Sequence, residues 1–390
     1  MQNYIIADEK APLSFFKKNG YYIVGNKIFN FKINALEEAT RTSLPITWEF
    51  NTEEFKSVNW RNDSLISIEQ VYRMRAQQLR DQYDYLVLAY SGGADSDTVL
   101  KSFINNNIHL DEIICDWSLS QTNNSNYKVS MDTAPENYTS EWELAIKPTL
   151  EYITKNFPKI KITLVDSTET LTIEDFEDTC TVTHNCGYVS VKRYRKISQR
   201  IRDLADQHNQ VGLIIGLEKP RLSVERGILC ASFFDSSCWI KSSYNDGYKK
   251  NIEYFYWAQD LPEIVAAQSR LIYQAIKHNT NVHSIFKFTE SDTPEESYKK
   301  TQLQREFIKH AIYPNWDNRF QAQKGSSPIY SEQYEWLWSK NKTIELESWE
   351  SSMNARLALV DKNHLILSNT GKFLGYRTNF VSRSYPVGKI

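Results

Sequence analysis

Residues 85–100 read YLVLAYSGGADSDTVL, and this stretch decides how the fold of the chain is interpreted. The apolar run Tyr85–Tyr90 is typical of a buried strand, the turn Ser91–Ser96 contains two glycines, and helix-compatible residues begin at Asp97. A strand that runs through a glycine turn into a helix is a ready anion site, because unpaired backbone N–H groups and the positive end of the helix dipole face the same point. The sequence therefore predicts a phosphate site in this turn.

The side chains of the turn favour the same ligand. Gly92 and Gly93 allow a tight turn and a close approach of phosphate to the backbone. Ser91 and Ser96 add hydroxyl donors. Asp95 would repel a phosphate unless a cation lay between them, so the turn also predicts Mg²⁺.

The turn SGGADS, residues 91–96, resembles the SGGxDS signature of the PP-loop, or N-type, ATP pyrophosphatases. This superfamily includes asparagine, argininosuccinate, GMP and NAD synthetases, tRNA-modifying enzymes and PAPS reductases. The resemblance implies an adenine nucleotide alpha hydrolase-like, Rossmann-like domain that binds ATP and Mg²⁺. It implies that Asp95 holds the metal and that pyrophosphate is bound by Ser91, Gly92, Gly93 and Ser96. The plainer alternative is a Gly-Gly turn capped by Ser91 and Asp95 without a ligand.

A second segment, residues 216–221, follows a later apolar run and reads GLEKPR. It resembles in position the second conserved segment of the superfamily, where the chain passes beside the nucleotide, although its charges are ordered differently. Gly216 would permit close approach, and Lys219 and Arg221 would hold the leaving pyrophosphate. Glu218 would share the metal with Asp95. The alternative is a surface loop of mixed charge.

Strands and helices alternate from residue 85 onward. Apolar runs predict strands at 85–90, 112–115, 161–165 and 212–215, separated by helical stretches at 98–106, 141–157 and 191–208. This order predicts an α/β fold with a parallel sheet and helices on both faces, whose ligands bind beyond the carboxyl ends of the strands. The polar segment 116–140 lies at that end of the sheet. It is interpreted either as a substrate lid or as a simple insertion.

Three units are predicted along the chain: a small α+β unit at 1–80, the ATP pyrophosphatase domain at 81–280 and a mostly helical region at 281–390. Gly25-Asn26 predicts a hairpin within Tyr21–Phe31, and Ser67 predicts the N-terminus of a helix over Ile68–Tyr83. The arginines of this helix are interpreted as solvated charges: Arg73, Arg75 and Arg80. Phe255, Tyr256 and Trp257 are expected in the core, with an aromatic wall for a base as the alternative.

Composition limits the class of protein. The chain has 390 residues, a 41% hydrophobic fraction and a formal net charge of −2, so nothing global requires nucleic acid or an anionic membrane as a partner. No apolar run is long enough to span a membrane, and MQNYIIADEK lacks the core of a signal peptide. Five cysteines without a CxxC pair suggest reduced thiols and a cytoplasmic location.

Other clusters of charged residues and cysteines are weaker indications of a functional site. The basic stretch at 192–202 is compatible with nucleic-acid binding, but an exposed helix face paired with acids is favoured. Cys180, His184 and Cys186 fit no common zinc spacing and are interpreted as a surface loop. Cys230 and Cys238 are either core residues or a thiol pair. Glu141-Trp142-Glu143 is interpreted as an acidic first helical turn rather than as a site for a substrate amine.

The resemblance implies a reaction in which a substrate oxygen attacks the α-phosphate of ATP, pyrophosphate leaves, and the adenylated oxygen is then displaced by a nucleophile. We expect a ligase or amidotransferase-like enzyme acting on a small molecule or nucleobase. The alternatives are a sulfur-transfer or PAPS-reductase-like enzyme and a nucleotide-binding module without turnover. A carboxylate nucleophile is already ionised, so no general base is required. The substrate, the nitrogen or sulfur donor and the oligomeric state are left open.

Overall fold

The computed structural model describes residues 5–6, 19–29, 32–61, 66–117, 142–166, 195–216, 219–235, 251–277, 279–287, 294–313, 365–367, 373–376 and 380–390. Several predictions lie outside these residues: most of the polar segment 116–140, the whole stretch from Cys180 to Cys186, Glu218 and Cys238.

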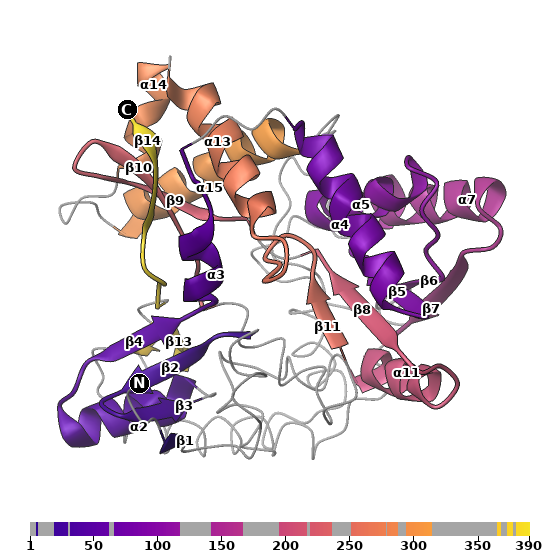
Figure 1. Ribbon diagram of the computed structural model, residues 1–390, viewed down its shortest axis with the longest axis horizontal. Coiled ribbons are helices and arrows are strands. Elements are labelled where there is room, and N and C mark those ends of the chain that lie inside the picture. Colours follow the sequence, from indigo (N-terminus) through magenta and orange to yellow (C-terminus); the bar gives the residue numbers. More distant parts are fainter. Residues whose placement is uncertain are drawn as a thin grey trace, which may run out of the picture.

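The central element is a five-stranded sheet in which every pairing is parallel (Figure 1). Its strand order is β11-β8-β5-β6-β7. The strands are β5 (Tyr85–Ala89), β6 (Glu112–Asp116), β7 (Lys161–Val165), β8 (Val211–Ile215) and β11 (Asn251–Tyr254). Four of them match predicted strands to within one residue, so the predicted α/β fold with a parallel sheet is confirmed at this level.

Helices lie on both sides of this sheet: in Figure 1, α5 and α7 lie above it and α11 lies below. These helices are α5 (Ala94–Ile104), α7 (Lys147–Asn156), which follows the π-helical turn η2 (Trp142–Ile146), and α11 (Arg195–Ala205). Helix α5 begins four residues earlier than the predicted Thr98. Gly93 is its N-cap, with an extended backbone (φ −78°, ψ 164°), and its carbonyl accepts from Asp97 N–H at 3.0 Å. Asp95 and Ser96 therefore lie in the first turn of a helix.

The N-terminal residues form a second sheet of order β1-β3-β2-β4. The predicted hairpin is confirmed, since β2 and β3 are antiparallel and join through Gly25, whose φ of +60° suits glycine. The elements are β1 (Ile5–Ile6), β2 (Tyr21–Val24), β3 (Lys27–Phe29), α2 (Lys32–Thr42), β4 (Ile46–Glu49) and α3 (Thr52–Ser57). Helix α4 (Ile68–Gln82) follows, and Ser67 and Gln70 form the capping box at its start.

The chain beyond residue 216 contains more strand than the sequence predicts. An antiparallel sheet has the order β14-β10-β9, with β9 (Arg221–Glu225), β10 (Ile228–Ser232) and β14 (Tyr385–Lys389). A further pair is β12 (Leu365–Leu367) with β13 (Phe373–Tyr376). The described helices of this part are α13 (Glu263–Lys277), α14 (Thr280–His283), the short 3-10 helix η4 (Ser284–Phe286) and α15 (Pro294–Ile312). Strand β14 pairs with β10 from far along the chain, which local patterns do not reveal. Strands β9 and β10 instead form a hairpin through Arg226 and Gly227, both with positive φ, which the sequence analysis overlooked. The unit boundaries at 80 and 280 stay a prediction.

Phe255, Tyr256 and Trp257 are buried directly after β11, so their predicted place in the core is confirmed. None of the described helices has the length and apolar character needed to cross a membrane.

Arg75 was predicted to be solvated, and the structure shows that this is wrong. The side chain is fully buried, and its guanidinium bonds Glu253 Oε2 at 2.8 Å and Asp260 Oδ1 at 3.1 Å. The hydroxyl of Tyr83 also donates to Glu253. Arg75 shares the apolar stripe of α4 with Ile68, from which it is separated by two helical turns, so helical spacing was the overlooked signal. Arg73 is exposed as expected, whereas Arg80 is largely buried and pairs with Asp111 at 2.6 Å.

A second buried carboxylate joins α11 to the sheet. Glu112, on β6, accepts from the Arg200 guanidinium at 2.6 and 2.9 Å, from Thr163 Oγ1 at 2.6 Å and from the Tyr85 hydroxyl at 2.9 Å. Burial raises the pKa of Glu112, but these hydrogen bonds outweigh it and leave the pKa below its ordinary value. The carboxylate is therefore ionised in the folded protein.

We expect Arg75→Met to lower the free energy of unfolding by about 3–5 kcal/mol, because it leaves Glu253 buried without its cation. The matched control is Arg73→Met on the exposed side of the same helix, which should change it by no more than about 0.5 kcal/mol. Urea denaturation measures both. Equal effects of the two substitutions would contradict the structural role of Arg75.

The Glu112–Arg200 pair predicts a pH dependence. Because the folded-state pKa of Glu112 is lowered, its contribution to stability is present above the ordinary carboxyl pKa and is lost as pH falls through the lowered value. We expect Arg200→Gln to destabilise the protein at pH 7, with a difference from wild type that shrinks as acid protonates Glu112. Urea midpoints measured between neutral pH and about pH 3 test this. Arg202→Gln is the control, since Arg202 bonds Gln199 on its own helix. A difference that stays constant with pH would contradict the role of this pair.

Candidate functional site

The glycine turn lies directly after the central strand of the parallel sheet. Ser96 Oγ donates to the Gly93 carbonyl at 3.2 Å and lies 3.2 Å from both the backbone nitrogen and the hydroxyl oxygen of Ser91. These contacts close the turn around the start of α5, whose first backbone N–H groups have no partner within the helix. Ser91 is exposed and Gly93 partly exposed, so the turn is open to a ligand on that side.

The two glycines of the turn have different roles. Gly92 has φ +74°, and a Cβ built on it would lie 2.7 Å from Ile146 Cγ1 of η2. Gly92 is therefore required both by the backbone conformation and by the packing of η2. Gly93 has an extended backbone, and among the described residues a Cβ there would have only Ser91 Oγ within 4 Å, at 3.6 Å. The space above Gly93 is thus the open part of the turn.

Gly216 brings the loop after β8 against the turn. A Cβ on Gly216 would lie 3.0 Å from both the carbonyl carbon of Asp95 and the backbone nitrogen of Ser96. The predicted close approach at Gly216 therefore occurs, and its partner in the structure is the first turn of α5.

Lys219 is the second predicted residue that the structure brings to the turn. Its Nζ lies 2.7 Å from Asp95 Oδ1 and 2.8 Å from Oδ2. The Asp95 and Lys219 side chains are 28% and 17% exposed, so solvent reaches this ion pair. The pair places one positive and one negative charge beside the turn.

Two tyrosines also contact Asp95: Tyr256, which was expected in the core, and Tyr313, which the sequence analysis did not consider. The Tyr313 hydroxyl, directly after α15, donates to Asp95 Oδ1, and the Tyr256 hydroxyl donates to the Asp95 carbonyl at 2.7 Å. Lys219 Nζ lies 5.7 Å from the centre of the Tyr313 ring. Burial raises the pKa of both tyrosines well above its ordinary value, so both phenols stay protonated and donate. No local motif marks Tyr313, since it reaches the turn only through the packing of α15.

Other predicted residues do not join this group in the described part of the chain. Arg221 is the first residue of β9, with its guanidinium 5.3 Å from the centre of the Phe234 ring. Burial lowers its pKa. Glu218 lies outside the described residues. Within the residues that the structure describes, no group of three or more His, Cys, Asp or Glu side chains could hold a metal ion.

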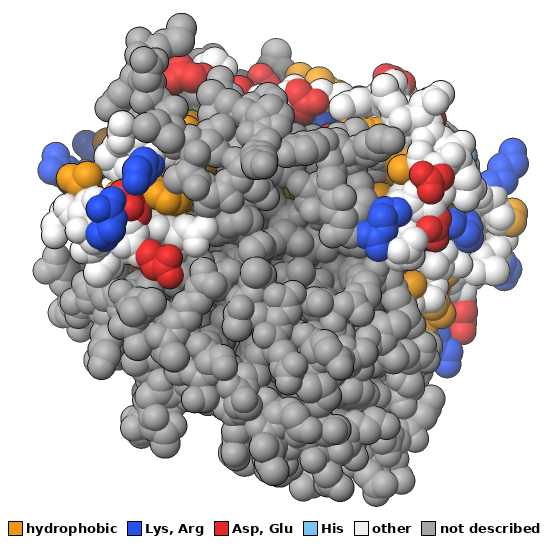
Figure 2. Space-filling view, turned by 90° about the horizontal axis from the view of Figure 1, so that it is seen from below, with side chains coloured by type: hydrophobic (Ala, Val, Ile, Leu, Met, Phe, Trp, Pro, Cys, Tyr) orange, Lys and Arg blue, Asp and Glu red, His pale blue; other side chains and the backbone are white. Residues whose placement is uncertain are grey.

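The other clusters give little support for a different site. In the basic stretch, Arg200 pairs with an acid as expected, but it is largely buried against the sheet and its partner is buried Glu112. Figure 2 shows acidic and basic side chains interspersed on the described parts of one face. Cys115 and Cys230 are buried and form no disulfide, and burial raises the pKa of Cys230 to about 11. At neutral pH that thiol is not a nucleophile.

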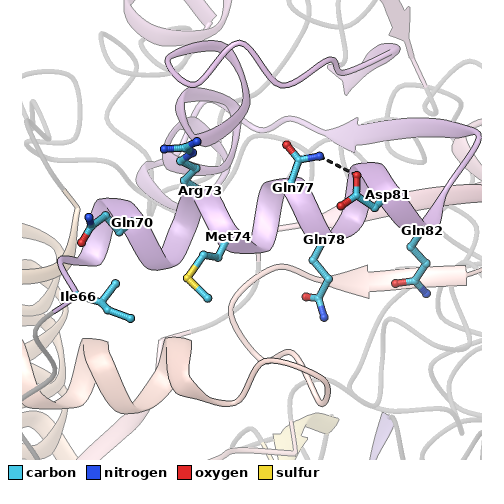
Figure 3. Close-up of a pocket in the computed structure, with 8 residues that line it drawn as sticks. All are labelled: Ile66, Gln70, Arg73, Met74, Gln77, Gln78, Asp81 and Gln82. Carbon is cyan, nitrogen blue, oxygen red and sulfur yellow. Dashed lines mark hydrogen bonds between the residues drawn. The ribbon is translucent and has the colours of Figure 1, made fainter.

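A cavity of about 850 Å³ lies along the exposed side of α4 (Figure 3). Long polar side chains and two apolar ones, Ile66 and Met74, line it. Its only carboxylate in the described lining, Asp81, accepts from Gln77 Nε2 at 2.7 Å. The buried side of α4 faces the core and carries Tyr72 and Arg75, so the cavity is separate from the glycine turn. It offers no cluster of catalytic groups in that lining.

A scan of the chain against protein-family models finds no match, and a search among curated proteins finds no similar sequence. The resemblance to the N-type ATP pyrophosphatases therefore depends on residues 91–96 and on their setting in the sheet.

Gly92 and Gly93 should differ in how well they tolerate substitution by alanine. We expect Gly92→Ala to lower the free energy of unfolding by about 1–3 kcal/mol, because its positive φ strains any side chain and Ile146 must move. We expect Gly93→Ala to change it by less than about 1 kcal/mol, because its backbone suits any residue and the space is open. Urea denaturation of the two variants side by side measures the difference. Equal losses would show that the turn is not arranged as described.

Proposed function

We propose that the chain is an ATP-dependent enzyme that forms AMP and pyrophosphate, with the nucleotide phosphates held by the turn Ser91–Ser96. The observation that carries the proposal is the SGGxDS turn at the carboxyl end of the central parallel strand, with Lys219 brought to it from the next strand. Backbone N–H groups, a helix N-terminus and a nearby ammonium group together suit a phosphate.

The strand order supports a Rossmann-like assignment of the sheet. From β5 the chain proceeds to β6 and β7 on one side, and later to β8 and β11 on the other. The carboxyl end of β5 is therefore the point at which the order reverses, and open α/β sheets bind their ligands at such points. Both loops of the proposed site, after β5 and after β8, leave the sheet there.

The residues fit the phosphates of ATP better than they fit a metal ion. Gly93 leaves open space at the start of α5, and the Ser91 and Ser96 hydroxyls face each other beside it. Asp95, the expected metal ligand, already has both carboxylate oxygens bonded to Lys219. Mg²⁺ is therefore expected to arrive on the phosphate oxygens of ATP, where it would neutralise charge on the leaving pyrophosphate.

The reaction we propose begins with attack of a substrate oxygen on the α-phosphate, while the turn grips the β- and γ-phosphates as a leaving group. Backbone N–H groups, the two serine hydroxyls and Lys219 then stabilise the charge that develops on pyrophosphate. Displacement of AMP by a nucleophile completes a ligase or amidotransferase-like reaction on a small molecule or nucleobase. The alternative, a sulfur-transfer or PAPS-reductase-like reaction, would draw on Cys180 or Cys186, which lie outside the described residues. A cytoplasmic location remains the expectation from the cysteine content.

The binding site is tested by thermal-shift titration with ATP and Mg²⁺. Gly93→Val is expected to fold, because valine favours the extended backbone at this position, and to lose stabilisation by ATP, because its methyl groups fill the space for phosphate. The melting temperature without nucleotide controls for folding. Unchanged ATP-dependent stabilisation in this variant would rule out the turn as the site.

The cleavage position is tested with ATP labelled at the α-phosphate and candidate carboxylate or nucleobase substrates. We expect AMP and pyrophosphate as products, because the turn binds the β- and γ-phosphates together and the chain has no GxxxxGK[ST] segment to favour γ-phosphoryl transfer. Asp95→Asn should lower the rate about 10²-fold, because it disturbs Lys219, which stabilises the charge on the leaving pyrophosphate. Chromatography separates the products. ADP as the main product would overturn the mechanism.

A further inference from the structure

Both carboxylate oxygens of Asp95 have hydrogen-bond partners. Lys219 Nζ bridges its two oxygens at 2.7 and 2.8 Å, and the Tyr313 hydroxyl donates to one of them. Mg²⁺ would need to approach one of these oxygens to about 2.1 Å, where it would meet a positive charge. The ammonium group therefore takes the position that a metal would occupy on Asp95.

We propose that, within the nucleotide site of the proposed function, Asp95 and Tyr313 are positioning residues for Lys219, and that Lys219 rather than a metal on Asp95 binds the phosphate. The proposal rests on the proposed function for the identity of the ligand. It differs from the role that the superfamily resemblance implies for Asp95.

The backbone explains why Lys219 is held at this place. Gly216 packs against the backbone of Asp95 and Ser96, which fixes the loop after β8 beside the turn. Lys219 follows three residues later, and buried Pro220 then leads the chain into β9. Gly216 and Pro220 thus lie on either side of Lys219 in the chain, and the Lys219 ammonium group lies 2.7 Å from Asp95 Oδ1.

Tyr313 is fixed in turn by a second set of contacts. The Tyr72 hydroxyl of α4 donates to the Ile312 carbonyl at 2.9 Å and accepts from Gln268 Nε2 of α13 at 3.0 Å. The Tyr256 ring lies 5.6 Å from that of Tyr72 and 5.8 Å from that of Tyr313. These contacts hold the end of α15 against the first turn of α5, so Tyr313 orients the carboxylate that orients Lys219.

The charges lead to a distinct expectation for metal dependence. Without Lys219, the negative charge of Asp95 would repel phosphate and a divalent cation would be essential. With Lys219 in place the local charge is balanced, so the turn should bind a phosphate group even when divalent cations are removed. Mg²⁺ would then strengthen binding through the phosphate oxygens alone, independently of Asp95.

Calorimetric titration with pyrophosphate, in EDTA and in excess Mg²⁺, tests this on the full chain. We expect wild type to bind in EDTA and Lys219→Met to bind at least about tenfold more weakly. The ratio of the Kd in EDTA to the Kd in Mg²⁺ should agree within about twofold between wild type and Asp95→Asn. Tyr313→Phe should weaken binding about threefold or more, and this effect should vanish when Lys219→Met is also present, because Tyr313 acts through Lys219.

The matched controls are Lys159→Met and Tyr152→Phe, two exposed positions on the outer surface of the chain, and neither should alter binding. A ratio that falls to about one in Asp95→Asn would identify Asp95 as a metal ligand and overturn this proposal, while the proposed function would stand. Absence of pyrophosphate binding to wild type in both buffers, or binding that Gly93→Val leaves unchanged, would instead overturn the proposed site and this proposal with it.

Discussion

The site depends on the parallel pairing of β5 with β8. Their register aligns Ala89 with Ile215, so both strands end at the same level of the sheet. The glycine turn leaves one strand and Gly216 leaves the other, and the missing side chain at Gly216 lets the two loops touch through their backbones. A side chain there would separate the loops and move Lys219 away from Asp95. The ion pair at the site is thus a consequence of strand register and one glycine.

Buried ion pairs elsewhere in the molecule show what distinguishes the pair at the turn. Arg75 with Glu253, and Lys32 with Asp235, are almost completely shielded from solvent and join segments that are distant in sequence. Pairs of that kind tie elements together and cannot exchange partners, since breaking them leaves a buried charge. Asp95 and Lys219 are partly exposed, at the end of the strands where a ligand can reach them. The ammonium group of Lys219 can therefore contact a bound phosphate at small cost while it stays beside Asp95.

Local patterns predicted what local interactions determine. The strand, turn and helix around residues 91–96, the hairpin at Gly25 and the cap at Ser67 each depend on neighbours within a few residues, and each is present. Arg75 shows a failure of interpretation, since its spacing placed it on the buried side of α4 but its charge suggested solvent. The strands β9, β10 and β14 were missed for two other reasons. Strand β14 pairs with β10 from far away in the chain, and a few alternating residues do not specify such pairing. Strands β9 and β10 form a local hairpin whose two-residue turn, Arg226-Gly227, was overlooked.

The same reasoning explains why half of the site could be predicted. The serines and glycines of the turn, with Asp95, are contiguous, and Gly216 and Lys219 follow a recognisable strand. Tyr313 carries no such mark, because its position depends on how α15 packs against α13 and α4. The predicted boundary at residue 280 passes between the turn and Tyr313, yet contacts join them across it. A chain cut there would keep every residue of the signature and lose the hydroxyl that holds Asp95. The signature therefore specifies where a phosphate can bind, while the distant helix determines how the charges around it are arranged.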